Sequence, residues 1–318
     1  MKKEKNAIAP LSRGFAYEAK LAQDTQAEDP IKDILDRLAS ENYFADPAIA
    51  TSIYMAQMLE RPLLVEGRPG VGKTEIANVM ARLLDTRLIR LQCYEGLDVT
   101  TALYEWNYPK QMLWIKLDER SGRTTEEREQ QIFSQDFLLE RPLLAALTEK
   151  DKPPVLLIDE VDRADEEFEA FLLEVLSDFQ VTVPEIGTIK AKHRPLVILT
   201  SNRTRDLSDA LRRRCLYLWI DFPDLEKELR IVRSKVDGIE EKLARQVVRF
   251  VDGSRHVGLD KVPGISETLD WAKAMVVLHM DHLDHDAVER TLGALVKDAD
   301  GLERFRRETI DEILSKIS

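Results

Sequence analysis

Residues 67–74 combine glycines, a lysine and a threonine at a spacing that suits a polyphosphate. They read Gly-Arg-Pro-Gly-Val-Gly-Lys-Thr, between the apolar run Leu63–Val65 and a stretch with helical apolar spacing. This is the strand–GxxxxGK[ST]–helix pattern. Its glycines let backbone N–H groups face an anion, and the N-terminus of the following helix favours the same charge. Lys73 adds a positive charge for the outer phosphates and Thr74 offers a hydroxyl to Mg²⁺, so the pattern indicates a nucleoside triphosphate site.

A pair of carboxylates follows a second apolar run. Val155–Ile158 is purely apolar, as is typical of a strand covered on both faces of a parallel sheet, and Asp159 and Glu160 come directly after it. Open α/β sheets bind ligands at the carboxyl ends of their strands. We therefore expect Asp159 to hold Mg²⁺ and Glu160 to polarise the attacking water as a general base. The alternative, a strand that merely ends in solvated acids, is weakened by the presence of Lys73 upstream.

Two later segments fit the same chemistry less specifically. The run Leu196–Thr200 leads into Ser201-Asn202, whose amide can hydrogen-bond the γ-phosphate or the attacking water, although Asn also commonly begins a turn. Three arginines, residues 212–214, precede the next β-rich run, Leu216–Ile220. A bare arginine triplet suits a phosphate-binding patch, a nucleic-acid contact or a solvated face.

Composition excludes several classes of protein. The 318 residues carry 46 basic and 58 acidic side chains, a net charge of −12, so general attraction to nucleic acid or anionic lipid is not expected. Cys93 and Cys215 are too few and too far apart for a disulfide scaffold or a CxxC metal site. No apolar stretch approaches the ~20 residues that span a bilayer, and the basic start Met1–Asn6 lacks the apolar block of a signal peptide. We expect a cytoplasmic protein without a membrane partner.

The elements that must position these residues fall into an α/β part and a helical part. Residues 1–30 are polar and aperiodic, and we expect an N-terminal arm there. Residues 31–222 are predicted to form an α/β core with a parallel sheet, and residues 223–318 a smaller all-helical lid domain hinged near Pro223. The expected strands are Leu63–Val65, Leu88–Cys93, Val155–Ile158, Leu196–Thr200 and Leu216–Ile220.

Helices are predicted from apolar periodicity. In the core they are Ile31–Ser40, Pro47–Leu59 and a one-faced helix between Ala164 and Phe179. In the lid they are Leu225–Val236, Glu240–Val251, Ser266–Leu278, Asp286–Lys297 and Leu302–Ile317. Asp286 and Glu289 are expected to form a capping box for the fourth lid helix. The charged stretch Asp118–Gln131 is expected to be an exposed insertion.

The order of these motifs resembles that of an AAA+ ATPase, and most closely the MoxR family. The glycine-rich loop, the Asp-Glu strand end, the Ser-Asn strand tip, Ala210–Cys215 and a helical lid follow one another as in that class. Asp159–Ala164 is similar to the acidic strand end of the family, and Gln180–Glu185 with Gly187 to its β-hairpin. The resemblance runs from about Ile31 to the C-terminus. Ser201–Arg205 and Ala210–Cys215 are also similar to the branch associated with carbon monoxide dehydrogenase accessory proteins.

The resemblance implies ATP and Mg²⁺ as ligands and assigns roles by position. The implied nucleotide contacts are Gly67, Pro69, Gly70, Val71, Gly72, Lys73, Thr74, Glu75 and Asp159. Thr74 and Asp159 would hold Mg²⁺, Glu160 would be the base, Asn202 the sensor, and Lys73 a phosphate contact that also acts in catalysis. Arg214, or Arg213 beside it, would be an arginine finger that reaches the ATP of a neighbour. A homo-oligomer is then implied, usually a six-membered ring in this family.

One departure concerns the lid. The family usually places an arginine after a Gly-x-Ser-x pattern, but here Gly264-Ile265-Ser266-Glu267 leads to Thr268. The γ-phosphate would then be read by another lid residue, with Arg255 and Lys273 as the two candidates, or not by the lid at all.

Two weaker signals each leave two interpretations open. Tyr94-Glu95-Gly96 lies where ring-forming relatives carry a pore loop, but Glu95 breaks the aromatic–hydrophobic–glycine pattern, so ordinary loop packing is the alternative. His279, His282 and His285 repeat every third residue. They suit either a metal ion or polar positions around a helix junction.

The leading functional hypothesis is a ring-forming AAA+ ATPase that remodels or matures a client protein. The MoxR resemblance implies a partner with a von Willebrand factor A (VWA) domain, and the narrower branch implies metalloenzyme assembly. The alternatives are a motor that acts on nucleic acid, which the acidic net charge opposes, and a nucleotide-gated scaffold without turnover, which Glu160 opposes. GTP is disfavoured because Asn202-Arg203-Thr204-Arg205 is not a base-reading Asn-Lys-x-Asp motif.

Overall fold

A five-stranded parallel sheet forms the centre of the protein in the computed structural model, which describes residues 29–119, 121–258, 261–308 and 310–317. Its strands are β1 (Leu63–Gly67), β2 (Leu88–Gln92), β5 (Val155–Asp159), β8 (Leu196–Ser201) and β9 (Leu216–Ile220), in the order β2-β5-β8-β1-β9. All five expected strands are therefore present. The expected N-terminal arm lies outside the described residues except for its last two positions.

The sheet register brings three strand ends together. Val65 of β1 lies opposite Thr200 of β8, and Ile158 of β5 lies opposite Leu199. Because the strands are parallel, the carboxyl ends of β1, β5 and β8 reach the same edge. The glycine-rich loop, the two carboxylates and Asn202 consequently follow from adjacent strands.

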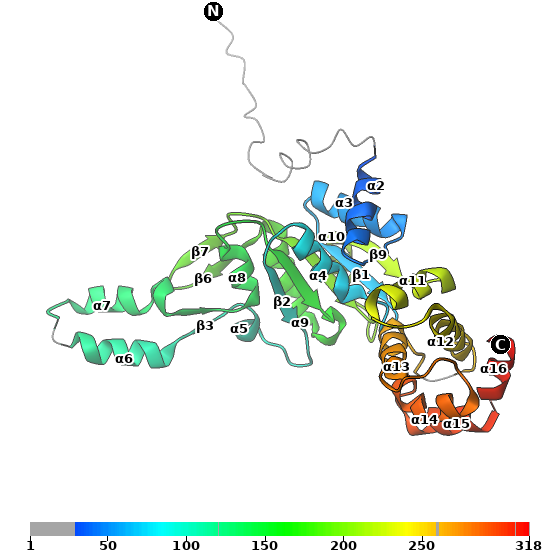
Figure 1. The fold of residues 1–318 in the computed structure, drawn as a ribbon. Coiled ribbons are helices and arrows are strands. Elements are labelled where there is room, and N and C mark those ends of the chain that lie inside the picture. Colours follow the sequence, from blue (N-terminus) through cyan, green and yellow to red (C-terminus); the bar gives the residue numbers. More distant parts are fainter. Residues whose placement is uncertain (1–28, 120, 259–260, 309, 318) are drawn as a thin grey trace, which may run out of the picture.

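Helices cover both faces of the sheet, which explains the purely apolar strands (Figure 1). On one face Leu63, Val65 and Leu157 pack with α2 (Pro30–Ser40), α3 (Pro47–Met58) and α4 (Lys73–Leu83). On the other face Leu64, Leu156 and Val197 pack with α8 (Pro142–Thr148) and α9 (Glu166–Asp178). The predicted helices α2, α3 and α9 are confirmed to within about two residues at their ends.

A long insertion separates β2 from β5, and its middle part projects from the core (Figure 1). It comprises α5 (Val99–Ala102), β3 (Tyr104–Trp106), α6 (Tyr108–Asp118), α7 (Thr125–Ile132), the 3₁₀ turn Gln135–Phe137, β4 (Leu138–Glu140) and α8. β3 pairs with β4 in antiparallel fashion, and α6 and α7 extend beyond them. We call residues 104–140 the projecting hairpin. The expected insertion Asp118–Gln131 is thus only the outer part of a larger unit.

A second hairpin precedes the strand that carries Asn202. β6 (Gln180–Val183) and β7 (Gly187–Lys190) pair in antiparallel fashion, as expected from sequence. Val183 is fully buried against Trp106 and Phe137, so this hairpin is packed to the base of the projecting hairpin.

The C-terminal part is helical and has its own apolar core. Its helices are α11 (Leu225–Lys235), α12 (Glu241–Ser254), α13 (Ile265–Val277), α14 (His285–Leu295), α15 (Ala299–Glu308) and α16 (Ile310–Ile317), preceded in the core by α10 (Asp209–Arg214). Among the described residues, none of the helices is long and apolar enough to cross a membrane.

The helix expected at Leu302–Ile317 corresponds to α15 and α16, between which residue 309 lies outside the described residues. One expectation about the lid helices is wrong. The cap of α14 is Asp284, whose carboxylate accepts from the N–H of Ala287. Asp286 lies inside the first turn and pairs with Arg290 instead, so it does not form a capping box with Glu289.

Candidate nucleotide-binding site

The loop between β1 and α4 has the backbone conformation that its glycines allow. Gly70 and Gly72 have φ values of 74° and 89°, in the left-handed region that disfavours other residues. Gly72 is the N-cap of α4 and offers no side chain to the first helical N–H groups. The helix therefore begins with unsatisfied donors and the positive end of its dipole, which together favour an anion.

A pocket of about 560 Å³ lies above this loop. It is lined by residues 69–75, by Asp159, Glu160 and Asn202 at the strand ends, and by the lid helices α11 and α13. All the expected nucleotide contacts except Gly67 thus line one pocket. A side chain on Gly67 would start 2.1 Å from the carbonyl oxygen of Ile220, so this glycine is required by close packing with β9.

Lys73 is buried within the loop. Its ammonium donates to the carbonyl oxygens of Gly67 (2.8 Å) and Arg68 (2.7 Å). Burial lowers the pKa of Lys73 to about 8, although the acids Asp162, Asp159 and Glu160 favour its charged form. The lysine is thus placed for phosphate contact but is held by its own loop in this structure.

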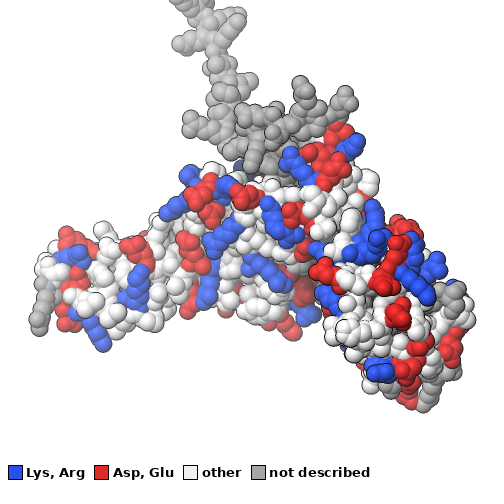
Figure 2. All heavy atoms as spheres, in the orientation of Figure 1, with Lys and Arg blue, Asp and Glu red and all other residues white. Residues whose placement is uncertain are grey.

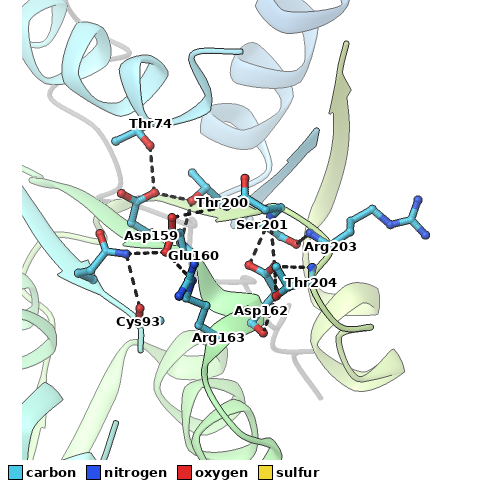
Figure 3. A network of polar contacts seen from close by, with 12 residues as sticks. Thr74, Cys93, Asp159, Glu160, Asp162, Arg163, Thr200, Ser201, Arg203 and Thr204 are labelled. Atoms are coloured by element: carbon cyan, nitrogen blue, oxygen red, sulfur yellow. Dashed lines mark hydrogen bonds and ion pairs between the residues drawn. The ribbon is translucent and has the colours of Figure 1, made fainter. Parts of the chain in front are cut away.

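Thr74 and Asp159 form the expected oxygen pair (Figure 3). The Thr74 hydroxyl donates to Oδ1 of Asp159 at 3.0 Å, and the Thr200 hydroxyl donates to the same oxygen at 2.5 Å. The Arg90 guanidinium lies 2.5 Å from Oδ2. A hydroxyl and a carboxylate side by side below a phosphate loop fit Mg²⁺, which takes one or two protein oxygens together with phosphate oxygens and water.

Glu160 sits at a strained turn beside this pair. Its φ of 54° lies in the left-handed region, which is uncommon for a residue with a side chain. Its carboxylate meets Arg163 at 2.8 Å and the amides of Gln92 at 3.2 Å and Asn202 at 3.5 Å. Its own N–H donates to Thr200 at 2.9 Å. The turn therefore aims Glu160 into the pocket, next to Asn202.

Asp162 holds the loop that carries Asn202. Its carboxylate is 2% exposed and accepts from the N–H groups of Asn202 (3.2 Å) and Thr204 (2.8 Å), and from the Thr204 hydroxyl (2.7 Å). Figure 3 shows these bonds joining the end of β5 to the end of β8. We did not predict this role, or that of Arg90. For Arg90 the only sequence signal is its alternation with Gln92 on one face of β2.

The arginine triplet lies outside the pocket. Arg214 contacts the hydroxyl of Ser177 on α9, and Arg212 lies 3.5 Å from the buried carboxylate of Glu66. Neither Arg213 nor Arg214 lines the pocket of its own chain. Any action of Arg214 on ATP would therefore have to be directed at another subunit.

The lid contacts the phosphate loop through the backbone. The N–H groups of Ile265 and Ser266, at the start of α13, donate to the carbonyl oxygen of Gly70 at 2.9 and 3.3 Å. A side chain on Gly264 would start 2.8 Å from both Gly70 Cα and the carbonyl oxygen of Pro69. Two glycines thus permit direct contact between the main chains of lid and loop.

Neither lid cation proposed from sequence lines the pocket. Arg255 is buried in the lid, where it pairs with both carboxylate oxygens of Glu228 at 2.7 and 2.8 Å and lies over the Phe222 ring. Thr268, at the usual arginine position, donates to the same carboxylate at 2.7 Å. The Glu228–Arg255–Thr268 cluster therefore fixes α13 to α11 and directs the Arg255 guanidinium to Glu228 rather than to the pocket.

Two lysines of α11 do line the pocket, and sequence reasoning missed both. Lys227 donates to Asp46 at 2.6 Å, and Lys235 lies 3.9 Å from Glu75. They are the lid cations that the structure places at the pocket wall.

The structure also places the residues of the two weaker sequence signals, the turn at residues 94–96 and the histidines. Tyr94 and Gly96 belong to a surface turn after β2, with Tyr94 exposed and Gly96 at a φ of 79°. Two of the three histidines meet acids: His282 contacts Asp281, and His285 contacts Asp311 at 2.7 Å. These hydrogen bonds raise the pKa of both imidazoles. No group of three or more His, Cys, Asp or Glu residues suited to a metal occurs within the described parts of the chain.

The family comparison agrees with this geometry. Residues 62–215 match the family model described as "AAA domain (dynein-related subfamily)". Residues 62–215 are thus similar to an AAA domain. The expected fold class is confirmed, because the AAA+ core with its parallel sheet is followed by a helical region.

The individual relatives of this protein are distant in sequence. It is 24% identical over 264 residues to the Holliday junction branch migration complex subunit RuvB of Thermotoga petrophila, covering 79% of this chain and 65% of the relative. It is also 24% identical to an uncharacterised protein of Staphylococcus aureus (strain bovine RF122), covering 74% of this chain and 84% of that protein. A structure of RuvB from Thermotoga maritima, a Holliday junction branch migration motor, aligns with a TM-score of 0.45 at 20% identity, covering 84% and 71% of the two chains.

Proposed function

We propose that this protein is a ring-forming AAA+ ATPase that couples ATP hydrolysis to the remodelling or maturation of a client protein, in the manner of MoxR-like chaperones. The observation that carries the proposal is the convergence of the phosphate loop, Asp159, Glu160 and Asn202 on one pocket that is also lined by α11 and α13. We assign residues 31–222 to the core and 223–318 to the lid. The proposal places the protein in the cytoplasm, where ATP is available.

The residues that line the pocket have different roles in ATP hydrolysis. The loop N–H groups and Lys73 bind and orient the triphosphate, and Thr74 and Asp159 would hold Mg²⁺, which neutralises phosphate charge when bound. Glu160 takes the proton of the attacking water. Its neighbour Asn202, with the amide 3.5 Å from Glu160, orients that water or the γ-phosphate. Positioning and electrostatics supply most of the catalysis in reactions of this kind.

The partners follow from the motif resemblance. A client protein, a VWA-domain partner and a homo-oligomeric ring, usually of six subunits, belong to the proposal. Assembly of a metalloenzyme is its narrowest form, supported by the segments Ser201–Arg205 and Ala210–Cys215.

Similarity to RuvB raises DNA branch migration as the competing function. The chain spans about 65% of the length of the RuvB relatives that it matches. Its net charge of −12 opposes binding that depends on neutralising phosphates.

The decisive experiment compares ATPase rates with and without duplex or four-way-junction DNA at ~0.15 M salt. We expect turnover without DNA and no stimulation by it. The companion measurement is ATP-dependent co-purification of a VWA-domain protein. DNA stimulation would overturn the chaperone assignment, and lack of turnover under all conditions would leave the scaffold alternative standing.

A further inference from the structure

Asp159, which is proposed to hold Mg²⁺, forms an ion pair with Arg90 of β2. Nη2 of Arg90 lies 2.5 Å from Oδ2 of Asp159. The side chain of Asp159 is 5% exposed, whereas that of Arg90 is 53% exposed. Burying a carboxylate is costly unless its charge has a partner, and Arg90 supplies that partner from the surface.

The sheet register puts these side chains on one face. In the parallel pair of β2 and β5, Arg90 lies opposite Leu157 and Gln92 lies opposite Asp159. Because side chains alternate along a strand, all four belong to the face on which Leu157 packs with α4. β2 is the edge strand of the sheet, so Arg90 reaches Asp159 from that edge, whereas Thr74 reaches it from α4.

The two oxygens of Asp159 have different partners. Oδ1 accepts from the hydroxyls of Thr74 at 3.0 Å and Thr200 at 2.5 Å, which uses both of its lone pairs. Oδ2 has Arg90 as its partner. A metal ion that draws on the charge of this carboxylate must therefore compete with the guanidinium of Arg90.

Arg90 is placed to act on Asp159 and not on the nucleotide. It is not among the residues that line the pocket. Its Nη2 also donates to Oε1 of Gln92 at 2.5 Å, so the guanidinium keeps a hydrogen-bond partner when it leaves Asp159. Arg90 is therefore a positioning residue, whose effect on a bound metal passes through Asp159.

The charge that acts on Asp159 is local. Figure 2 shows basic and acidic side chains interspersed over the core on the visible face, without a broad area of one sign. Lys73 is also near Asp159, but its ammonium donates to the carbonyl oxygens of Gly67 and Arg68. Within the described residues, the ion pair of Asp159 is the one with Arg90.

We propose that Arg90 is a displaceable counter-ion of Asp159, which competes with Mg²⁺ and lowers the affinity of the site for the metal. Arg90 leaves Oδ2 for its second partner, Gln92, when the metal binds, and it returns when the metal departs with the product. The buried carboxylate thus keeps a counter-charge in both states. The consequence is a site that releases its metal more readily than an unpaired carboxylate would.

This inference rests on the proposed function for the presence of nucleotide and Mg²⁺ in the pocket. It is tested with a non-hydrolysable ATP analogue, so the result does not depend on turnover. A wild-type chain that binds the analogue but hydrolyses no ATP would overturn the proposed function and leave the role of Arg90 open to the same measurement. A chain that binds no analogue with or without Mg²⁺ would overturn both.

The test is titration calorimetry of the full chain with the analogue, once in EDTA and once in saturating Mg²⁺. The ratio of the two dissociation constants reports how tightly the metal is held, because binding of metal and nucleotide is linked. Arg90→Gln removes the charge but keeps a polar side chain. We expect this ratio to rise by at least about tenfold, since one cation within ~4–6 Å changes the proton affinity of a carboxylate by ~10- to 10³-fold. Affinity in EDTA should not rise, because Asp159 has then lost its counter-charge.

Three further variants separate charge from shape. Arg90→Lys keeps the charge, and its ratio should lie nearer to wild type than to Arg90→Gln. Arg87→Gln removes the same charge just before β2, at the end away from Asp159, where the side chain is 65% exposed and lies 3.7 Å from Glu149. It should leave both dissociation constants unchanged. Gln92→Leu removes the second partner of Arg90, so its ratio should fall below wild type, and this variant tests the proposal even if Arg90→Gln does not fold.

Three results would overturn the proposal. A ratio in Arg90→Gln that equals or falls below the wild-type value would show that Arg90 does not compete with the metal. The same rise in Arg87→Gln would assign the effect to net charge instead of to the contact with Asp159. An equal rise in Arg90→Lys would assign it to the shape of the side chain. Circular dichroism and thermal melting identify variants whose fold is altered.

Discussion

The hydroxyl of Thr200 connects the two acids of the site. It donates to Asp159 at 2.5 Å and accepts from the N–H of Glu160 at 2.9 Å. A single side chain on β8 thus orients the residue expected to hold Mg²⁺ and the residue expected to activate water. At this scale the site depends on hydrogen bonds between neighbouring strands rather than on the motif residues alone.

Glu160→Gln should preserve ATP binding and lower turnover by ~10²–10⁴, because the amide keeps the shape of the side chain but cannot accept a proton. Lys73→Ala should instead weaken ATP binding, since it removes a phosphate contact. Nucleotide titrations and steady-state ATPase assays separate the two effects. Glu174→Gln, an exposed acid on α9, is the matched control. Turnover by Glu160→Gln at the wild-type rate would place the base elsewhere.

Lys73 should also make ATP binding depend on pH. Its pKa is lowered to about 8 by burial, and only the charged form attracts phosphate. Affinity should therefore fall by about tenfold between about pH 7 and about pH 9, and binding should take up a proton above pH 8. The measurement is the dissociation constant for ATP across this range, and in Lys73→Arg, which stays charged, the slope should disappear. A flat profile for wild type would contradict the assignment.

The same lowered pKa acts on stability with a definite sign. The folded-state pKa lies below the unfolded value of 10.5, so between about pH 8 and 10.5 the unfolded chain holds more protons. The contribution of Lys73 to the free energy of unfolding therefore increases as pH rises through that window. Below about pH 8 the lysine is charged in both states, and its desolvation cost is constant.

Secondary-structure elements were predictable where their signals are local. The strands Leu63–Gly67 and Val155–Asp159 are short apolar runs next to turn residues, and sequence places them to within two residues. The roles of Arg90 and Asp162 were not predictable, because their partners come from other strands.

At the scale of elements, the contact between α13 and the phosphate loop should control closure of the lid. Gly264→Ala would place a methyl group 2.8 Å from backbone atoms of Pro69 and Gly70, so α13 must move away from the loop. We expect weaker ATP binding and slower hydrolysis, since a misplacement of ~1 Å can cost ~10²-fold in rate. Titration calorimetry and ATPase assays would measure both.

The control for this substitution is Gly293→Ala in α14, where a side chain would meet no atom within 4 Å. It should leave ATP binding unchanged and stabilise the helix by up to ~1 kcal/mol. Equal behaviour of the two alanine variants in the ATPase assay would show that the α13 contact does not govern closure.

At the scale of the whole molecule, the proposed role of Arg214 as a finger needs a neighbouring subunit. Arg214 lies beside Ser177, away from the pocket of its own chain, so it would act across a head-to-tail contact of the kind that closes rings. Fingers supplied by another subunit are worth ~10³–10⁵ in rate. Arg214→Ala should therefore bind ATP normally and hydrolyse it slowly.

Mixing tests whether the finger acts between subunits. Arg214→Ala combined with Lys73→Ala should partly restore turnover, because some interfaces then pair an intact pocket with an intact finger. The measurement is the ATPase rate against mixing ratio, with light scattering in the presence of ATP. A chain that stays monomeric and hydrolyses ATP at a concentration-independent specific rate would exclude the ring. If Arg213→Ala lowers the ATPase rate and Arg214→Ala does not, the arginine finger is Arg213.

The meeting of Gly70 and Gly264 has a consequence for mutational scanning. The lid and the loop touch there through peptide groups, so replacing a side chain does not remove the contacting atoms. An alanine scan of the side chains of α13 would report the loss of buried Thr268 and Trp271 but would miss the junction, unless it also replaced the glycines. Comparison of side chains among relatives would miss it for the same reason. In this protein, the contact between the phosphate loop and α13 depends on two glycines, Gly70 and Gly264, because neither has a side chain.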